Sequence, residues 1–254
     1  LLGFNELPGA FGLALSYLTI IVVMNSFNLI DGVDGLASSL GILTMLVFGS
    51  YFYAIDFQAY ALLAFAMAGS LIAFIIFNHY PAKIFMGDSG SLMIGLVNAI
   101  LVIKFINVAD APFVSLQVPS AVAIGFAVLM VPLLDTLRVF SIRILNGWSP
   151  FIPDRNHVHH LLLDRGLGHA SVTACCLAVN IAFIGLGWLG RGLGPNYLLL
   201  ALLTLAFSGL GILYYGNSRS RRLVVTSDLD GKVKLKPASK VMTLQKESTV
   251  VEKN

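Results

Sequence analysis

Charge is scarce in this sequence. Only 11% of its 254 residues are Asp, Glu, Lys or Arg, whereas an ordinary soluble domain has about 25%. This shortage argues against a water-soluble globule. Cysteine is scarcer still, because Cys175 and Cys176 are the only two and are adjacent in an apolar stretch. With no CxxC spacing and no further partner, the pair argues against metal or redox chemistry, and we expect two small core residues.

Long uncharged intervals separate the few charges. Six of them reach the length of about 20 residues that a helix needs to cross roughly 30 Å of hydrocarbon. The interval that starts at 89 is short, but it suffices if Lys104 snorkels from a helix that runs to about Val108. We therefore predict an all-α, polytopic integral membrane protein with about seven transmembrane helices. The intervals are 7–30, 35–55, 57–82, 89–103, 111–134, 166–190 and 192–218.

The basic residues predict the orientation of these helices. If the helices alternate in direction and Asp31 faces the cytoplasm, fourteen of the 16 Lys and Arg lie inside, and only Lys104 and Arg191 lie outside. This distribution follows the positive-inside rule. We expect residues 1–216 to form a transmembrane domain and residues 217–254 to form a cytoplasmic tail.

The first polar cluster is NSFNLIDGVDGLA, which runs from Asn25 to Ala37. Carboxylates at membrane depth are costly unless they are paired, hydrated or bound to a cation, so Asp31 and Asp34 are candidate functional residues. Gly32 and the glycine at 35 allow the chain to leave the helix and to present backbone N–H groups to a ligand. The alternative is a capped helix end in solvent. On a helix, four polar side chains at a spacing of three would share a slowly drifting face: Asn25, Asn28, Asp31 and Asp34.

The second polar cluster is PAKIFMGDSGS, which runs from Pro81 to Ser91. Asp88 could simply cap the start of a helix. Lys83 and Phe85 add a partner for phosphate and a stacking surface, which capping does not require.

The third polar cluster is SPFIPDRNHVHH, which runs from Ser149 to His160 and follows Asp135. It could be a zinc site, but no fourth ligand lies at the usual spacing, and histidine beside arginine suits an anion better than a dication. A solvated histidine run without function is the other alternative. The cluster gathers four candidate anion ligands within six residues: Arg155, His157, His159 and His160.

The alternation of the predicted helices brings all three clusters to the same face of the membrane. Together they supply carboxylates for a hard divalent cation, an arginine and a lysine for phosphate, and an aromatic ring. Mg²⁺ is commonly held by one or two carboxylates together with the phosphate oxygens of a substrate. A nucleoside diphosphate substrate fits this set of residues, since phosphoryl transfer needs mainly positioning and neutralisation of charge.

With these motifs the sequence resembles the polyprenyl-phosphate N-acetylhexosamine-1-phosphate transferases, which are polytopic enzymes of glycosyltransferase family 4 type. The likeness covers roughly residues 16–215 and includes PLLDT at 132–136. The HVHH run looks like the branch that uses UDP-N-acetylglucosamine and undecaprenyl phosphate. The alternative is the peptidoglycan phospho-N-acetylmuramoyl-pentapeptide translocase branch, which usually has three consecutive histidines.

The resemblance implies a reaction and its partners. The enzyme would transfer N-acetylhexosamine-1-phosphate from a UDP-sugar to polyprenyl phosphate and release UMP, as the first membrane step of cell-envelope polysaccharide synthesis. Its cofactor would be Mg²⁺, with Mn²⁺ as the alternative. It would lie in the inner (plasma) membrane of a bacterium, with no nucleic-acid partner and with a homodimer left open.

The resemblance also implies roles for single residues. Asp88 would ligate the metal, and Asn28 would lie near the metal and the diphosphate. Phe85 would stack on uracil in a base pocket formed with Gly32, Val33 and Asp34. The expected catalytic residues are Asp31, Asp34, Asp88 and His157, and the expected substrate ligands are Asn28, Gly32, Val33, Lys83, Phe85, Arg155, His159 and His160. Asp135 is expected near the metal or just behind its ligands.

One departure from the family pattern concerns an adjacent Asp-Asp pair in an upstream loop. This sequence contains no Asp-Asp dipeptide and does not begin with Met, so we expect that N-terminal helices precede it.

We expect direct attack of the lipid phosphate on the sugar-bound phosphorus, and a covalent enzyme intermediate is the alternative. Two readings without this chemistry stay open, namely a secondary transporter and a binding or scaffold protein on the same fold.

Overall fold

A computed structural model describes residues 9–145, 147, 158–217, 223–227 and 233–237. Its elements in chain order are α1 (Gly9–Ile30), α2 (Leu36–Ala54), α3 (Gln58–Asn78), α4 (Gly87–Val108), α5 (Ala121–Val128), α6 (Met130–Leu145), α7 (Val158–Leu163), α8 (His169–Leu189), the short 3₁₀ helix η1 (Arg191–Leu193), α9 (Pro195–Asn217), β1 (Leu223–Ser227) and β2 (Val233–Pro237).

Six helices are long and apolar enough to cross a membrane, and they are α1, α2, α3, α4, α8 and α9. They correspond to six of the seven predicted intervals, so the prediction of a polytopic membrane protein is confirmed. The helix that was expected to extend past Lys104 does end at Val108. The ammonium group of Lys104 lies over the rings of Phe57 and Tyr60, 5.1 and 5.3 Å from their centroids. These cation–π contacts hold the side chain at the end of α4, beside the connection between α2 and α3.

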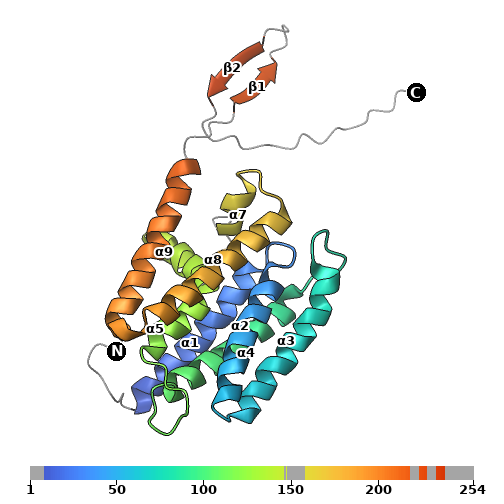
Figure 1. Cartoon of the computed structure of the whole chain (residues 1–254). Coiled ribbons are helices and arrows are strands. Elements are labelled where there is room, and N and C mark those ends of the chain that lie inside the picture. The colour runs from blue at the N-terminus through green and yellow to red at the C-terminus, as the bar shows by residue number, and fades with distance from the viewer. Residues whose placement is uncertain (1–8, 146, 148–157, 218–222, 228–232, 238–254) are drawn as a thin grey trace. The chain divides into compact units, whose positions relative to one another are not determined.

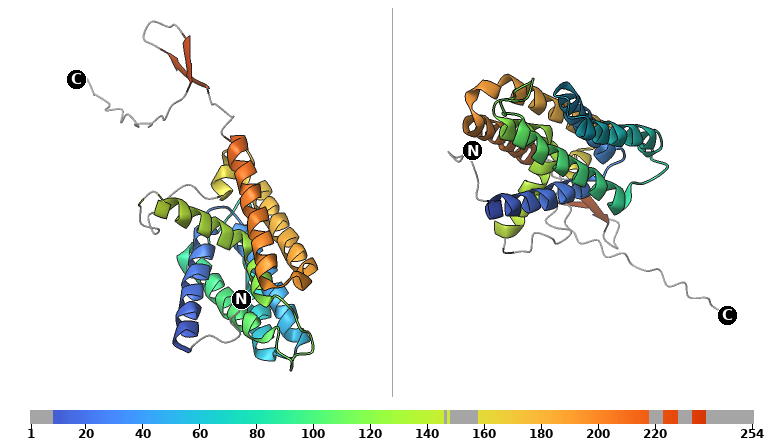
Figure 2. Two further views of the ribbon diagram at one scale, coloured as in Figure 1. Left: turned by 90° about the vertical axis from the view of Figure 1, so that its left-hand side faces the viewer. Right: turned by 90° about the horizontal axis from the view of Figure 1, so that it is seen from below.

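The predicted span 111–134 is not one continuous helix. It contains α5 and the start of α6, two helices that meet at an angle of 86°. Figure 2 (left) shows α6, in yellow-green, lying across the neighbouring helices. The two helices together could count as a seventh, broken span. The predicted span was expected to close before Asp135, but Asp135 lies inside α6, which runs to Leu145.

Pro132 and Asn180 explain how the chain tolerates this break. Pro132 has no N–H group, so it cannot donate the helical hydrogen bond to the carbonyl of Val128. The side chain of Asn180 on α8 makes that bond instead, with Nδ2 donating to the Val128 carbonyl at 2.9 Å. Its Oδ1 accepts from the N–H of Val131 at 3.0 Å. Asn180 is fully buried, and it satisfies backbone groups that would otherwise be costly in an apolar surrounding.

Small residues let the helices approach one another closely. A Cβ atom at Gly95 of α4 would lie only 2.5 Å from the Cα of Met24 on α1, so α1 and α4 pack backbone against backbone. This contact determines how near the ends of α1 and α4 come to each other. Cys176 is buried, as expected, whereas Cys175 is exposed.

The connections between helices gather at two opposite ends of the unit that contains them. The α1–α2 and α3–α4 connections, together with α7 and the start of α8, lie at one end, which we call the pocket end (Figure 1). The α2–α3 and α4–α5 connections lie at the other end. The predicted alternation of the helices is thus confirmed for the described residues.

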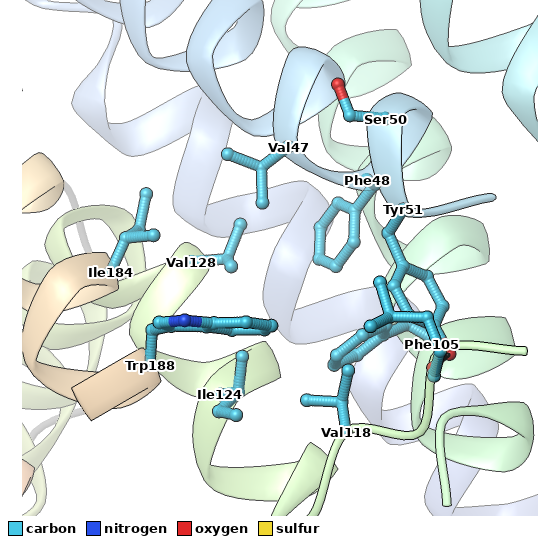
Figure 3. A pocket seen from close by; sticks show the side chains of 11 residues that line it. Val47, Phe48, Ser50, Tyr51, Phe105, Val118, Ile124, Val128, Ile184 and Trp188 are labelled. Carbon is cyan, nitrogen blue, oxygen red and sulfur yellow. Dashed lines mark hydrogen bonds between the residues drawn. The ribbon is translucent and has the colours of Figure 1, made fainter. Parts of the chain in front are cut away.

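An apolar pocket of about 230 Å³ lies between α2, α4, α5 and α8 toward the end opposite to the pocket end. Figure 3 shows the indole of Trp188 on one side of it and the rings of Phe48, Tyr51 and Phe105 on another. Its walls are almost entirely apolar, so it offers no groups for the chemistry that the polar clusters predict.

The chain divides into two compact units, Leu1–Leu210 and Gly211–Asn254. The division falls inside α9. The all-α prediction is confirmed for the described part of the first unit. In the second unit β1 and β2 form an antiparallel pair, with Leu223 opposite Pro237 and Ser227 opposite Val233. The division into residues 1–216 and 217–254 stays a prediction.

Candidate functional site

The connection between α1 and α2 is a tight turn. α1 ends at Ile30, so Asn25 and Asn28 lie on the helix, whereas Asp31 and Asp34 lie on the turn. Gly35 has a φ of +75°, a left-handed conformation that glycine adopts without steric cost. The turn therefore points its carboxylates in directions that a continued helix would not allow.

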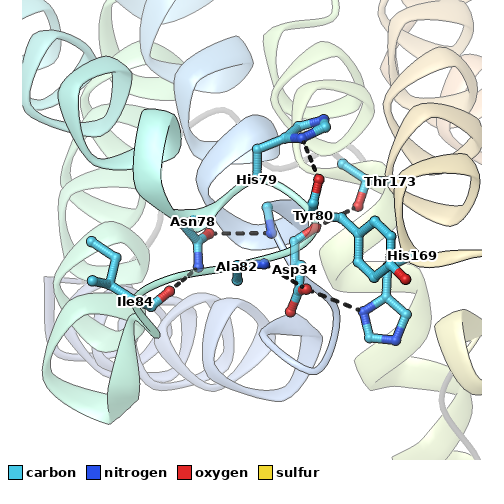
Figure 4. A network of polar contacts seen from close by, with 9 residues as sticks. Asp34, Asn78, His79, Tyr80, Ala82, Ile84, His169 and Thr173 are labelled. Atoms are coloured by element: carbon cyan, nitrogen blue, oxygen red, sulfur yellow. Dashed lines mark hydrogen bonds and ion pairs between the residues drawn. The ribbon is translucent and has the colours of Figure 1, made fainter.

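Asn78 fastens this turn to the end of α3 (Figure 4). Its Oδ1 accepts hydrogen bonds from the N–H of Gly35 at 3.2 Å and from the hydroxyl of Ser38 at 3.0 Å. Its Nδ2 donates to the carbonyl of Ile84 at 3.0 Å. Asn78 is 4% exposed, and one buried side chain thus holds the α1–α2 turn against the α3–α4 connection. Sequence reasoning missed this residue, although an amide at the end of an apolar stretch needs partners and could have indicated it.

Asp34 makes a further link between the two connections. Its Oδ2 accepts a hydrogen bond from the N–H of Ala82 at 3.2 Å. Its backbone carbonyl accepts one from the hydroxyl of Thr173 on α8 at 3.0 Å. His169, the first residue of α8, places Nδ1 3.7 Å from the same Oδ2. The turn is therefore in contact with both the α3–α4 connection and α8.

Asn28 and Asp88 join the first polar cluster to the second. The Nδ2 of Asn28 donates to Asp88 Oδ1 and to the hydroxyl of Ser91, both at 3.1 Å. Asp88 lies in the first turn of α4, where the helix dipole favours a carboxylate. Asp88 makes no side-chain capping bond to its own helix among the described contacts, and its carboxylate is oriented by α1 instead. The alternative of a simple N-cap is therefore not what the structure shows.

These residues line a pocket of about 290 Å³ at the pocket end. Its walls come from the α1–α2 turn, the end of α3 and the start of α4. The lining residues are Asn28, Asp31, Gly32, Val33, Asp34, Asn78, Phe85, Met86, Gly87 and Asp88. Seven of the predicted site residues are thus brought together, although up to 60 positions separate them along the chain.

Asp31 has a perturbed acidity in this pocket. Burial, and then the negative charge of Asp88, raise the pKa of Asp31 to about 6. The two carboxylates therefore experience each other's field in a partly desolvated place. A cation between them would relieve both effects, which makes the pair a candidate for binding one.

The donor set fits a magnesium ion that is shared with a phosphate ligand. No cluster of three or more His, Cys, Asp or Glu that could hold a metal occurs in the described residues, so a site built wholly from such side chains is not seen there. Mg²⁺ does not need one, because it is usually held by one or two carboxylates with phosphate oxygens and water. Asp31, Asp88 and the amide oxygen of Asn28 could supply hard oxygen ligands for such an arrangement.

The third polar cluster is described only in part. Asp135 is 2% exposed, and its Oδ1 accepts a hydrogen bond from the N–H of Val158 at 2.8 Å. This contact fastens the start of α7, the helix that carries His159 and His160 in its first turn. Asp135 thus supports the histidine segment rather than lining the pocket.

The remaining predicted residues have these positions. Lys83 is exposed on the α3–α4 connection and does not line the pocket, while Phe85 lines it with 80% of its surface exposed. Arg155 and His157 lie outside the described residues, as do the side chains of His159 and His160. The chemical roles assigned to all these residues stay predictions.

The fold and the pocket define a class: a multi-pass membrane protein with an acidic, oxygen-rich pocket at one end of its helix bundle. Residues 2–106 match the model of glycosyl transferase family 4, and this range contains the first two polar clusters.

Curated relatives match a longer part of the chain. The undecaprenyl-phosphate alpha-N-acetylglucosaminyl 1-phosphate transferase of Yersinia pestis is 32% identical over 207 residues, which cover 78% of this chain and 54% of the relative. A probable undecaprenyl-phosphate N-acetylglucosaminyl 1-phosphate transferase of Bacillus subtilis is 34% identical over 155 residues, 61% of this chain and 41% of the relative. The decaprenyl-phosphate N-acetylglucosaminephosphotransferase of Mycobacterium leprae is 33% identical over 168 residues, 60% of this chain and 41% of the relative. The chain thus spans about half the length of the curated relatives it matches.

Proposed function

We propose that this protein transfers N-acetylglucosamine-1-phosphate from UDP-N-acetylglucosamine to a polyprenyl phosphate. The products are UMP and a polyprenyl-diphospho-sugar. The observation that carries the proposal is the single pocket lined by Asn28, Asp31, Phe85 and Asp88, which come from two polar clusters far apart in sequence. The names of the relatives support the choice of reaction and of donor sugar.

The pocket suits the nucleotide end of the donor. Its volume of about 290 Å³ is just below the roughly 300–1,000 Å³ that is usual for ligand pockets, so it would hold part of a nucleotide sugar. The exposed ring of Phe85 offers a flat apolar face on which a planar base can stack. Backbone groups of Gly32 and Val33 on the turn can bind the polar edge of that base.

The acidic side of the pocket would hold the diphosphate through a magnesium ion. When bound, the ion would neutralise charge on the diphosphate and polarise its phosphorus–oxygen bonds. Asp88, Asp31 and the amide oxygen of Asn28 would be its protein ligands. The hydrogen bond from Asn28 fixes the rotamer of Asp88, so this carboxylate is oriented before any ligand arrives.

The transfer step needs one bond to form and one to break. An oxygen of the polyprenyl phosphate attacks the phosphorus that carries the sugar, and the bond from this phosphorus to the bridging oxygen of UMP breaks. The electron pair of that bond leaves with UMP. In this proposal Arg155, His157, His159 and His160 bind the phosphates and offset the negative charge that gathers on them.

The membrane environment explains why the pocket lies at one end of the bundle. A water-soluble donor must reach it from the aqueous side, while the prenyl chain of the acceptor stays among lipid tails. Holding both at this boundary turns an encounter between two phases into a positioned reaction. We propose that the pocket end and the C-terminal tail face the cytoplasm of a bacterial plasma membrane, because Lys83 and Arg165 lie on connections at this end whereas Lys104 lies at the other.

The proposal is tested with the chain in proteoliposomes that contain undecaprenyl phosphate and Mg²⁺. UMP release from UDP-N-acetylglucosamine is measured for the wild type, for Asp88→Asn and for Asp110→Asn. Asp110 is an exposed carboxylate at the opposite end of the bundle and serves as the matched control. We expect release that Asp88→Asn lowers by at least 100-fold and that Asp110→Asn leaves intact.

Two results would contradict the proposal. Binding of UDP-N-acetylglucosamine without release of UMP would favour the scaffold reading over the transferase. Faster turnover of UDP-N-acetylmuramoyl-pentapeptide than of UDP-N-acetylglucosamine would assign the chain to the translocase branch instead.

A further inference from the structure

We propose that His169 is a positioning residue for the donor pocket, in that it holds the carboxylate of Asp34 and through it the α1–α2 turn. This inference rests on the proposed function. His169 belongs to none of the three polar clusters and does not line the pocket. It acts on the pocket through Asp34, which does.

The argument begins with the contacts of Asp34. Three elements meet at this residue, namely its own turn, the α3–α4 connection through Ala82 and α8 through His169 and Thr173. Among the described residues both contacts of the carboxylate use Oδ2. Figure 4 shows this oxygen between the Ala82 N–H and the imidazole, with the other carboxylate oxygen on the far side.

The surroundings of His169 orient its ring toward Asp34. The ring lies 5.3 Å from the ring of Tyr80, with 36° between the planes. The side chain is 37% exposed, yet its Nδ1 atom is buried and has no hydrogen-bond partner within the described residues. Asp34 Oδ2 lies 3.7 Å from it, slightly beyond hydrogen-bond distance. A buried nitrogen that faces a carboxylate is stabilised when it presents an N–H to that carboxylate, so Nδ1 and Asp34 Oδ2 are matched as donor and acceptor.

The position of His169 at the start of α8 fits this role. A carboxylate near the N-terminus of a helix is favoured by the helix dipole, whereas a cation there is disfavoured. The carboxylate of Asp34 is therefore favoured at this end of α8. A neutral imidazole with its proton on Nδ1 can make the same contact with that carboxylate as a charged one. The required feature is thus a donor at the Nδ1 position.

The contact also links the donor pocket to the histidine segment. Only five residues, 164–168, separate α7 from α8. The start of α7 is fastened by Asp135, and the start of α8 is fastened to the turn by Thr173 and His169. The position of α7 relative to the donor pocket therefore depends on the contacts that α8 makes with Asp34.

The test uses two amide variants that differ in where they place a donor. In His169→Asn the side-chain amide nitrogen can occupy the Nδ1 position, whereas in His169→Gln it lies one methylene further out. Thr173→Val removes the bond from α8 to the backbone of Asp34 and serves as the comparison for a loosening of the same helix. For each variant the Kd of UDP-N-acetylglucosamine with Mg²⁺, the KM and kcat of transfer, and the Tm are measured on the whole chain in lipid.

We expect His169→Gln to raise Kd and KM about tenfold while kcat stays within about twofold, because the contact between the imidazole and the Asp34 carboxylate is lost from binding. His169→Asn is expected to restore Kd to within about twofold of the wild type. An Asp34→Asn, His169→Gln double variant is expected to be much less than additive, since both changes remove the same contact.

Distinct results would overturn the inference and the proposed function. If the wild type binds UDP-N-acetylglucosamine but His169→Gln binds it equally well, the positioning role is wrong and the transferase proposal stands. If His169→Asn is as impaired as His169→Gln, or if both merely lower Tm as Thr173→Val does, the residue is structural. If the wild type neither binds nor turns over this donor, the proposed function itself fails.

Discussion

The contact between Gly95 and α1 allows a test of whether the packing of α1 against α4 controls the geometry of the pocket. In Gly95→Ala the new Cβ would lie 2.5 Å from the Cα of Met24, and it must move away by about 0.9 Å to reach the 3.4 Å at which ordinary van der Waals contact begins. The clashing atoms belong to the backbone of α1, so no side chain can rotate aside. The two helices must therefore separate or shift.

This shift reaches the pocket, because Asn28 lies one turn beyond Met24 and Asp88 lies two turns before Gly95. A separation of 0.9 Å would lengthen the 3.1 Å bond between Asn28 and Asp88 to about 4 Å, which is no longer a hydrogen bond. Overpacking of this kind costs about 1–3 kcal/mol of stability. A displacement of about 1 Å in a positioned site can cost roughly 100-fold in rate.

The assay compares Gly95→Ala with Gly69→Ala. A Cβ at Gly69, in α3, has no atom within 4 Å, so this control adds the same methyl group without a clash. We expect Gly95→Ala to lower kcat for transfer by about 100-fold and to lower Tm, and Gly69→Ala to change neither. If Gly95→Ala keeps both kcat and Mg²⁺-dependent donor binding, then the close approach of α1 and α4 does not control the geometry of Asn28 and Asp88.

Three further predictions concern single side chains. Phe85→Ala should raise the KM for UDP-N-acetylglucosamine more than the KM for lipid phosphate, because the stacking face for the base is lost, and equal changes would argue against stacking. Because the pKa of Asp31 is raised from 3.8 to about 6, the folded, metal-free protein binds an extra proton between these values. Its stability should therefore fall as pH rises from about 4 to 6, and Asp31→Asn should remove this component of the Tm profile in EDTA. Mg²⁺-dependent donor binding should weaken below about pH 6 in the wild type, and a flat profile would exclude Asp31 from the cation site. A cysteine placed at Asn156 should react with a reagent added from the cytoplasmic side, and protection there would contradict the proposed orientation.

The transmembrane helices could be predicted from the sequence because a charged side chain in the hydrocarbon core costs free energy, so each spanning helix needs about 20 residues almost without charge. The break between α5 and α6 could not be predicted in the same way. The interval 111–134 has no charge, and Pro132 can occur in spanning helices as well as at their ends. The break is stabilised by Asn180, 48 positions after Pro132, whose amide replaces the missing bond. A lone asparagine in an apolar stretch shows that it needs partners, but not which ones.

The candidate site divides along a similar line. The residue types and their motifs indicated Asp31, Asp34, Phe85 and Asp88, because carboxylates, glycines and an aromatic ring at a membrane edge have few other uses. His169 was not predicted as a functional residue, because a single histidine outside a motif is usually a surface residue. Only the packing of α8 against the turn places it next to Asp34.

The sequence alone thus indicated which segments are apolar enough to cross a membrane and that the first two polar clusters lie at the same end, since both follow from the transfer cost of each residue and from alternation along the chain. The tertiary structure decided which atoms meet. Whether Asn28 orients Asp88, or Asn78 fastens the turn, depends on distances of a few tenths of an ångström between helices. Those distances depend on the volumes of many side chains that pack together from different helices. A local sequence pattern covers only one helix, so it cannot predict them.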